Sequence, residues 1–280
     1  MGWGGKSGPV LAADENGGSK GAPGGAMFLS CRPASFGQAG DEAYGHLAEW
    51  GVRFVEISMP KAENAARVQE DLQRHGLSVG SMQVAVDLGD VDLPERMDEA
   101  ARRVREQFGS TRIFTSAHAG KLSLETAYDA LRRVGDAAGR HGVTVMLETH
   151  PDLGTSGAVA AVTMRAVDHP HVRINWDPAN VYFYNERCDG RAEFDQAVPY
   201  LAGVHLKDTG GGFRSWDFPA LGEGVVDFQY ILKRLVDIGF DGPCTMEIEG
   251  VKGEKLSREQ YVERVRKSVD HVRGLGYFRP

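Results

Sequence analysis

The stretch GRHGVTVMLETH, residues 139–150, contains the unit from which most of this chain is built. A helix-type segment ends at Gly142, and the apolar run VTVMLE follows at once. A glycine just past a helix adopts the left-handed conformation without steric cost and lets the chain turn directly into a strand. The run closes on Glu148, and His150 follows two residues later. Because a carboxylate buried alone is costly, we expect Glu148 to belong to a shared polar site.

The same unit recurs along the chain. Apolar β-type runs begin near residues 28, 53, 78, 111, 143, 172, 202 and 244. Other helix-to-strand junctions carry Gly51, Gly76, Gly109 and Gly239, and apolar residues recur at helical spacing, as at Phe228, Ile231, Leu235 and Ile238. Eight alternating β and α units predict a single parallel (β/α)8 TIM barrel, an α/β fold. An open, doubly wound sheet is the alternative, but no GxGxxG follows the first strand to support its dinucleotide-binding version.

Residues 1–26 differ in composition from the rest of the chain. They are rich in Gly, Pro and small polar residues and have no apolar period, which predicts a flexible tail. This segment lacks the apolar core of ~7–15 residues of a secretory signal, and Lys6 stands where the myristoylation pattern needs Ser or Thr. Residues 27–280 are the predicted barrel, because a chain of 280 residues with 41% apolar content can bury one large core.

Charge and cysteine content narrow the classes of partner. The formal net charge is −7 and no block rich in Lys or Arg occurs, which argues against nucleic acid as the main partner. No segment reaches the ~18 consecutive apolar residues of a membrane span. Cys31, Cys188 and Cys244 have no metal or redox spacing, and we do not expect a disulfide framework. We therefore expect a soluble, cytoplasmic protein with a small-molecule ligand.

Three further apolar runs carry metal-ligand residue types where they end: Asp177 in VRINWD, His205 and Lys207 in LAGVHLKD, and Glu247 and Glu249 in PCTMEIEG. The carboxyl ends of barrel strands meet at one mouth, where active sites lie. Residues two apart on a strand share a face, so both members of each such pair can point into the mouth. Further strand-end candidates are Glu56, Gln83 and His118, although each of these alone is equally consistent with an ordinary surface or loop residue.

These residues resemble a known family. The order Glu148, Asp177, His205, Glu247, together with HLKDT at 205–209 and LGEGVVDF at 221–228, is similar to the xylose isomerase-like TIM barrel superfamily over about residues 27–275. That group includes sugar and sugar-phosphate isomerases and epimerases, inosose dehydratases and the IV-type apurinic endonucleases. The resemblance implies that the four residues bind one divalent cation. Three carboxylates and one imidazole suit Mn²⁺ or Mg²⁺ and tolerate Co²⁺ or Zn²⁺.

The chemistry implied by the resemblance is enolisation of a keto sugar. A cation that chelates a carbonyl oxygen and a neighbouring hydroxyl acidifies the carbon between them, and Glu148 and Glu247 would move the proton. The residues expected to bind substrate are His150, Lys207, Arg214, Glu56, Gln83, His118, Asn180 and Trp216. Arg214 is equally consistent with a solvated loop residue, and Trp216 with packing under the loop. No GxxxxGK[ST] loop occurs, which favours an unphosphorylated substrate.

The endonuclease branch fits the sequence poorly. Its three-metal cluster needs a histidine where this chain has Asn180, and an Asp and a His where it has Trp216 and Phe218. The leading hypothesis is therefore a metal-dependent isomerase or epimerase acting on a keto sugar or polyol. The alternatives are a lyase of the same fold, inosose dehydratase-like or eliminating an aglycone from a 3-oxo-glycoside, and a non-catalytic sugar-binding barrel. Families of this kind are frequently homo-oligomers.

Overall fold

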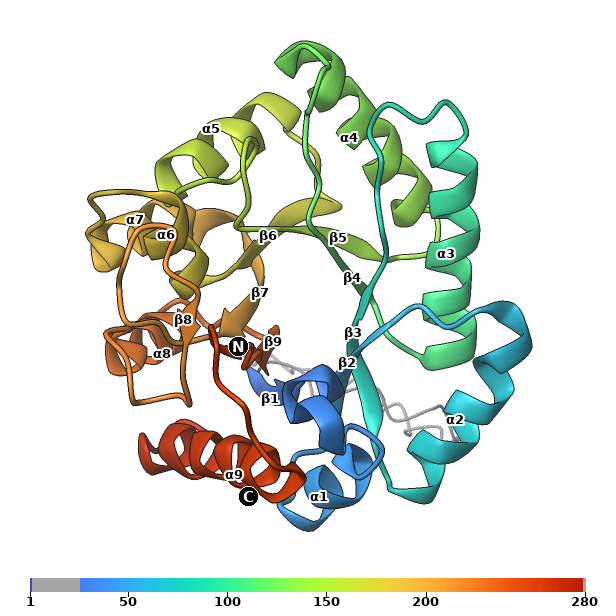
Figure 1. The fold of residues 1–280 in the computed structure, drawn as a ribbon. Helices are drawn as coiled ribbons and strands as arrows, with labels where there is room; N and C mark the ends of the chain where they lie inside the picture. Colours follow the sequence, from blue (N-terminus) through green and yellow to red (C-terminus); the bar gives the residue numbers. More distant parts are fainter. Residues whose placement is uncertain (2–25, 279–280) are drawn as a thin grey trace.

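The computed structural model describes Met1 and residues 26–278. Its centre is a closed barrel of eight parallel strands, which confirms the predicted fold (Figure 1). The barrel strands, in their order around the ring, are β1 (Phe28–Cys31), β2 (Phe54–Ser58), β3 (Ser78–Gln83), β4 (Arg112–Thr115), β5 (Thr144–Glu148), β6 (Val172–Trp176), β7 (Leu201–Leu206) and β9 (Pro243–Met246). Every predicted run became one of these strands. The predicted tail lies almost wholly outside the described residues and stays a prediction.

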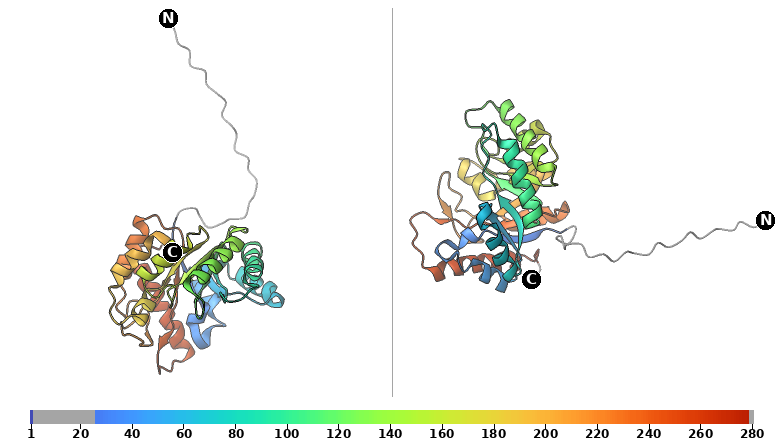
Figure 2. Two further views of the ribbon diagram at one scale, coloured as in Figure 1. Left: turned by 90° about the horizontal axis from the view of Figure 1, so that it is seen from above. Right: turned by 90° about the vertical axis from the view of Figure 1, so that its right-hand side faces the viewer.

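Helices surround the strands on the outside, as the two side views also show (Figure 2). The α-helices are α1 (Ala43–Glu49), α2 (Ala65–Arg74), α3 (Leu93–Phe108), α4 (Leu124–Gly139), α5 (Gly157–Val167), α6 (Pro178–Tyr184), α7 (Gly190–Ala197), α8 (Phe228–Asp237) and α9 (Arg258–Gly274). Short 3-10 turns are η1 (Pro33–Ala39), η2 (Ala62–Asn64) and η3 (Val198–Tyr200). Among the described helices, none combines the length and apolar character that crossing a membrane would require.

The glycines at the helix-to-strand junctions adopt the predicted conformation. Gly109 has φ 67° at the end of α3, and its N–H donates to the carbonyl oxygens of Arg105 and Val104. The other predicted glycines also have positive φ, namely Gly51, Gly76, Gly142 and Gly239. A side chain at these positions would be strained, because L-residues rarely adopt this conformation. These glycines therefore determine where the helices before them end and where the following strands begin.

The apolar stripe of α8 shows how the helices bury their inner faces. Phe228, Ile231 and Leu235 are buried between α8 and the barrel. Ile238 was predicted to continue this stripe, but it is 42% exposed. The reason is that α8 ends at Asp237, so Ile238 is the cap and no longer follows the helical period. The prediction for Ile238 was therefore wrong.

The segment between β7 and α8 carries a small second sheet near the mouth of the barrel. There β8 (Asp217–Phe218) pairs antiparallel with β10 (Gly250–Val251). Asp208 anchors this segment, because its carboxylate accepts hydrogen bonds from the backbone N–H groups of Gly222 at 2.8 Å, Gly224 at 2.9 Å and Val226 at 3.1 Å. The buried Asp208 side chain thus joins the HLKDT and LGEGVVDF motifs, together with a backbone hydrogen bond from Val225 N–H to the carbonyl of Thr209 at 2.9 Å.

Candidate active site

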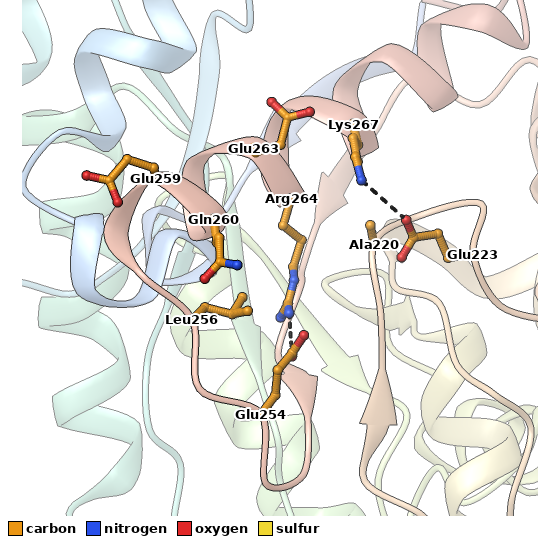
Figure 3. A pocket seen from close by; sticks show the side chains of 9 residues that line it. All are labelled: Ala220, Glu223, Glu254, Leu256, Glu259, Gln260, Glu263, Arg264 and Lys267. Atoms are coloured by element: carbon orange, nitrogen blue, oxygen red, sulfur yellow. Dashed lines mark ion pairs between the residues drawn. The ribbon is translucent and has the colours of Figure 1, made fainter.

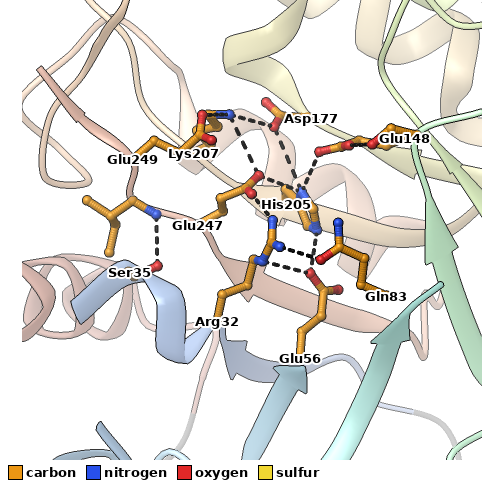
Figure 4. Close-up of polar contacts among 12 residues, drawn as sticks. Arg32, Ser35, Glu56, Gln83, Glu148, Asp177, His205, Lys207, Glu247 and Glu249 are labelled. Atoms are coloured by element: carbon orange, nitrogen blue, oxygen red, sulfur yellow. Dashed lines mark hydrogen bonds and ion pairs between the residues drawn. The ribbon is translucent and has the colours of Figure 1, made fainter. Parts of the chain in front are cut away.

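The four predicted ligands meet at the mouth of the barrel (Figure 4). Glu148 ends β5, Asp177 follows β6, His205 lies on β7 and Glu247 follows β9. Each offers one ligand atom, these atoms all lie within 4.8 Å of one another, and all four residues are buried. They converge because the strands are parallel, so that their carboxyl ends open onto the same mouth of the barrel.

The ligand atoms of this cluster lie close to one another. Nδ1 of His205 lies 2.9 Å from Oε2 of Glu247, 3.2 Å from Oε1 of Glu148 and 3.8 Å from Oδ2 of Asp177. Within the described chain, His205 Nδ1, Asp177 Oδ2 and Glu247 Oε2 are shut off from solvent and make no hydrogen bond. Buried polar atoms without partners are costly. A divalent cation would satisfy them together, and the set of three oxygens and one nitrogen fits such an ion.

Glu56 orients the histidine. Its Oε1 lies 3.0 Å from Nε2 of His205, and its other oxygen accepts a hydrogen bond from the hydroxyl of Ser81. A proton on Nε2, directed at this carboxylate, leaves the lone pair of Nδ1 pointing into the cluster. Glu56 was predicted to touch substrate, but it is only 2% exposed and lies behind His205. Its position supports an orienting role instead.

Arg32 is a site residue that sequence reasoning missed. Its guanidinium contacts the carboxylate of Glu247, lies 3.5 Å from Glu56 and donates to Oε1 of Gln83 at 2.9 Å. It also lies over the ring of Phe114, 5.2 Å from the centroid. The signal was present, because Arg32 directly follows the apolar run FLSC of the first strand, as the other site residues follow theirs.

Lys207 brings a second buried cation to the mouth. Its ammonium contacts Glu249, lies 3.6 Å from Asp177 and 3.7 Å from Glu247, and donates to Oδ1 of Asn180 at 3.2 Å. Burial alone would lower the pKa of Lys207, but the carboxylates of Asp177 and Glu247 outweigh it and raise the pKa. The ammonium is therefore charged, and it can donate hydrogen bonds to a ligand oxygen.

Glu148 is held in its ionised form. Its Oε2 lies 3.1 Å from Nδ1 of His150 and accepts a hydrogen bond from the hydroxyl of Ser116. Burial alone would raise the pKa of Glu148, but the imidazoles of His150 and His205 lower it to about 2. In turn, burial would lower the pKa of His150, and the Glu148 carboxylate raises it. Glu148 is thus an anion in neutral solution.

Part of this group of residues lines a cavity of about 260 Å³. Predicted residues found there are Gln83, Glu148, His150, Asn180, Lys207, Trp216 and Glu247. Aromatic walls from Phe114, Phe183 and Tyr184, together with Ser116, were not predicted as site residues. Phe183 packs against Phe218 with ring centroids 5.9 Å apart, and both rings belong to segments that the helical and strand patterns leave undefined. Large flat walls beside a few polar groups are typical of small-molecule sites.

Five predicted residues do not line this cavity. Asp177, His205 and Glu56 are buried in the cluster beside it, and the other two, His118 and Arg214, lie apart from the cluster. His118 is exposed, its Nδ1 contacts the carbonyl of Pro151, and it lines a neighbouring hollow of about 440 Å³. Its ring still packs edge-on against that of His150, with centroids 5.8 Å apart. Arg214 is also exposed, and its guanidinium lies over the ring of Phe213 at 5.0 Å. The structure does not bring either side chain to the cavity.

Another hollow, of about 410 Å³, lies beside α9 (Figure 3). Its lining includes Glu223, Glu254, Glu259 and Glu263. The two cations in it are Arg264, which pairs with Glu254, and Lys267, which lies 4.0 Å from Glu223. It lacks the buried, partnerless atoms of the barrel mouth, so the mouth is the better candidate site.

A family model described as the xylose isomerase-like TIM barrel matches residues 45–273. This chain belongs to that family. The predicted resemblance is thereby confirmed, and the cluster at the barrel mouth lies inside the matched range.

This chain is similar to L-ribulose-5-phosphate 3-epimerase UlaE of Shigella flexneri serotype 5b, which is 24% identical over 230 residues that span 76% of this chain and 70% of that protein. Salmonella paratyphi B UlaE is 29% identical over 134 residues, but that match spans only 47% of this chain and 45% of the relative.

Solved structures share the fold. The D-allulose 3-epimerase of Methylomonas sp. superimposes with a TM-score of 0.69 at 18% identity, covering 89% of this chain and 98% of that chain. The probable 3-DHS dehydratase AsbF of Bacillus anthracis gives a TM-score of 0.66 at 19% identity, covering 86% and 98%. At these identities the likeness extends to the fold alone.

Proposed function

We propose that this chain is a divalent-metal-dependent isomerase or epimerase acting on a keto sugar or a related polyol. The observation that carries the proposal is the buried cluster of Glu148, Asp177, His205 and Glu247 beside a cavity of about 260 Å³. Within the described chain, three of its facing atoms, His205 Nδ1, Asp177 Oδ2 and Glu247 Oε2, make no hydrogen bond. The family assignment supports the proposal, since a sequence relative is named L-ribulose-5-phosphate 3-epimerase and a structure with the same fold is named D-allulose 3-epimerase.

The four cluster residues would hold one divalent cation, with Mn²⁺ favoured by the oxygen-rich donor set. Such a cation would polarise the carbonyl and an adjacent hydroxyl of the substrate and so stabilise the negative charge that develops when the intervening carbon loses a proton. Glu56 would keep the imidazole of His205 in the tautomer that the site needs.

Proton transfer falls to Glu148 and Glu247. Both carboxylates direct one oxygen at Nδ1 of His205 and have the other oxygen held from behind. Burial would raise the pKa of Glu247, but His205 and Lys207 lower it well below its usual range, so both glutamates start as anions that can accept a proton. Two carboxylates that act from different sides of a substrate carbon can remove a proton and return one.

The remaining polar groups would bind hydroxyl oxygens. Lys207, Asn180 and His150 line the cavity and carry hydrogen-bond donors. The charges of Arg32 and Lys207 are already matched by Glu247 and Glu249. A phosphate would have to compete with these carboxylates, which favours an unphosphorylated substrate. Free keto sugars should therefore react with higher kcat/KM than their phosphate esters.

A second candidate is a lyase that uses the same proton abstraction. Arg32 contacts the outer oxygen of Glu247, whereas the outer oxygen of Glu148 contacts Ser116 and His150, groups that exchange protons more readily than a guanidinium. Epimerisation needs two proton-exchanging groups, but elimination needs one base. In this reaction Glu148 removes the proton beside the carbonyl, the electron pair forms a carbon–carbon double bond, and the β-substituent leaves with a proton from His150 or Lys207.

The experiment that separates these functions is product analysis with a panel of 2- and 3-keto sugars and 3-oxo-glycosides, with and without added Mn²⁺. Inversion or carbonyl migration in the presence of Mn²⁺ is the expected result. Release of water or an aglycone would identify the lyase instead. A protein that binds Mn²⁺ and sugar but converts no compound in the panel would be a binding barrel, and the enzymatic proposal would be wrong.

A further inference from the structure

We infer that the active-site cavity continues past Trp216 into a second compartment that receives a ring joined to the reacting sugar, so that the substrate is a glycoside. This inference rests on the proposed function for the position of the reacting sugar. A hollow of about 290 Å³ adjoins the cavity. The two share Arg32, Trp216, Glu247 and Glu249, and the second continues to Ile248 and Tyr261. The two hollows therefore lie side by side at these four residues.

Aromatic side chains line the second compartment. Trp216 is 45% exposed, and its ring packs edge-on against Phe218 with centroids 5.2 Å apart. At the other side, the ring of Tyr261 lies against Gly37, where an added Cβ would collide with it. Gly37 has φ 50° and so suits glycine on conformational grounds as well. Rings of this type bind flat partners with an apolar face, such as an aryl group or the C–H face of a sugar.

The charges of this compartment select a neutral occupant. Arg32 pairs with Glu247, and Glu249 pairs with Lys207, so the ionic groups at the inner end already have partners. Beyond them the lining includes the buried side chain of Ile248. A charged substituent would lose hydration without gaining an ion pair, whereas a neutral ring buries apolar area against the aromatic walls.

Size leads to the same conclusion. Pockets for drug-sized ligands measure about 300–1,000 Å³. The main cavity, at about 260 Å³, lies below that range and suits a single sugar, and the second hollow adds about 290 Å³ beside it. The second ring could be an aryl aglycone or another sugar, because both offer the apolar face that fits the aromatic walls. Binding experiments can distinguish these two kinds of ligand.

The test is isothermal titration calorimetry of the full chain, with and without Mn²⁺, using unreactive glycosides. Methyl and phenyl β-glycosides of glucose, galactose and xylose form matched pairs, and cellobiose and xylobiose provide the second-sugar arm. For at least one sugar, we expect the two-ring compound to bind about tenfold more tightly than the methyl glycoside. If only the phenyl glycosides bind more tightly than the methyl glycosides, the second compartment binds an aryl group. If only the disaccharides bind more tightly, it binds a sugar.

Substitutions test whether the second compartment provides the additional affinity of the two-ring compound. Tyr261→Ala lies in the second compartment only, so it should remove most of the gain and leave the affinity for the methyl glycoside unchanged. Tyr128→Ala on α4 is the matched control and should change neither affinity. Circular dichroism checks that each variant folds. Equal affinity in every pair, no binding by any glycoside, or a gain that survives both Tyr261→Ala and Trp216→Ala would overturn the inference. Because no turnover is measured, failure here is distinct from failure of the proposed function.

Discussion

Glu56 lies 3.0 Å behind Nε2 of His205, and this contact directs Nδ1 of the same ring toward Glu148 and Glu247. Carboxylates that hold a metal-binding histidine from behind typically change metal affinity by about 10- to 100-fold when they are mutated. We therefore predict that Glu56→Gln weakens Mn²⁺ binding by about that factor, measured by competition with a chelator. Glu63→Gln, at an exposed site on η2, is the control. Unchanged affinity in Glu56→Gln would show that His205 needs no such partner.

Arg32 should act as a positioning residue for Glu247. Its contact with Oε1 leaves Oε2 of the same carboxylate facing His205. Arg32→Ala would release Glu247, and we expect kcat to fall by about 100-fold with a smaller change in KM. Arg32→Lys keeps the charge but loses the planar fork, so it should recover only part of the activity. Equal kcat in the wild type and Arg32→Ala, with both proteins folded, would rule out this role.

Metal binding should release a proton. Burial would lower the pKa of His205, but the carboxylates of Glu56 and Glu247 outweigh it and raise the pKa above the ordinary value of about 6.5. Below the raised pKa the metal-free ring is protonated and must lose a proton before it can bind Mn²⁺, so affinity should fall as the pH falls. Calorimetry in buffers of different ionisation enthalpy measures this proton. Affinity that is independent of pH from 5 to 8 would contradict the assignment of His205.

The raised pKa of His205 also predicts how the stability of the metal-free protein depends on pH. A raised folded-state pKa means that His205 contributes stability that is fully present below about pH 6.5 and is lost as the pH rises through the folded pKa. Saturating Mn²⁺ should reverse this loss, because the neutral ring then gains a ligand. Thermal unfolding at several pH values, with and without Mn²⁺, measures both effects.

Asp208 should stabilise the segment that carries Trp216. Its carboxylate accepts hydrogen bonds from the N–H groups of Gly222, Gly224 and Val226. The substitution Asp208→Ala would remove this acceptor from the three N–H groups. We expect the free energy of unfolding to fall by roughly 3 kcal/mol. Urea denaturation measures the change, and Asp237→Ala, at an exposed ion pair with Lys233, should cost under about 1 kcal/mol. Similar losses in both variants would mean that Asp208 is not the anchor.

The barrel was predictable because its signals are local. Gly109 and the other junction glycines mark helix ends by a conformation that depends on few neighbours, and the apolar runs follow directly. The four ligands could be grouped for a related reason: Glu148, Asp177, His205 and Glu247. The carboxyl ends of parallel barrel strands meet at one mouth, and this does not depend on the conformation of the loops.

What the sequence left open depends on tertiary contacts in loops. The segment that carries Arg214 is fixed by a hydrogen bond from its backbone N–H to the carbonyl of Phe183 at 2.9 Å, and no local pattern predicts that pairing. Likewise, Glu56 was predicted at a strand end, but it lies in the middle of β2, and only the packed barrel places it behind His205 rather than against a ligand. Local patterns therefore located the ligand cluster, and the packed structure was needed to assign the residues around it.

The central claim is metal-dependent proton abstraction by Glu148, and proton NMR in deuterated water tests it most directly. A panel of 2- and 3-keto sugars is incubated with the chelated protein, with the Mn²⁺-reloaded protein and with reloaded Glu148→Gln. The account predicts that solvent deuterium enters the carbon beside the carbonyl only with the reloaded wild type. Deuterium incorporation that survives both chelation and Glu148→Gln would contradict it.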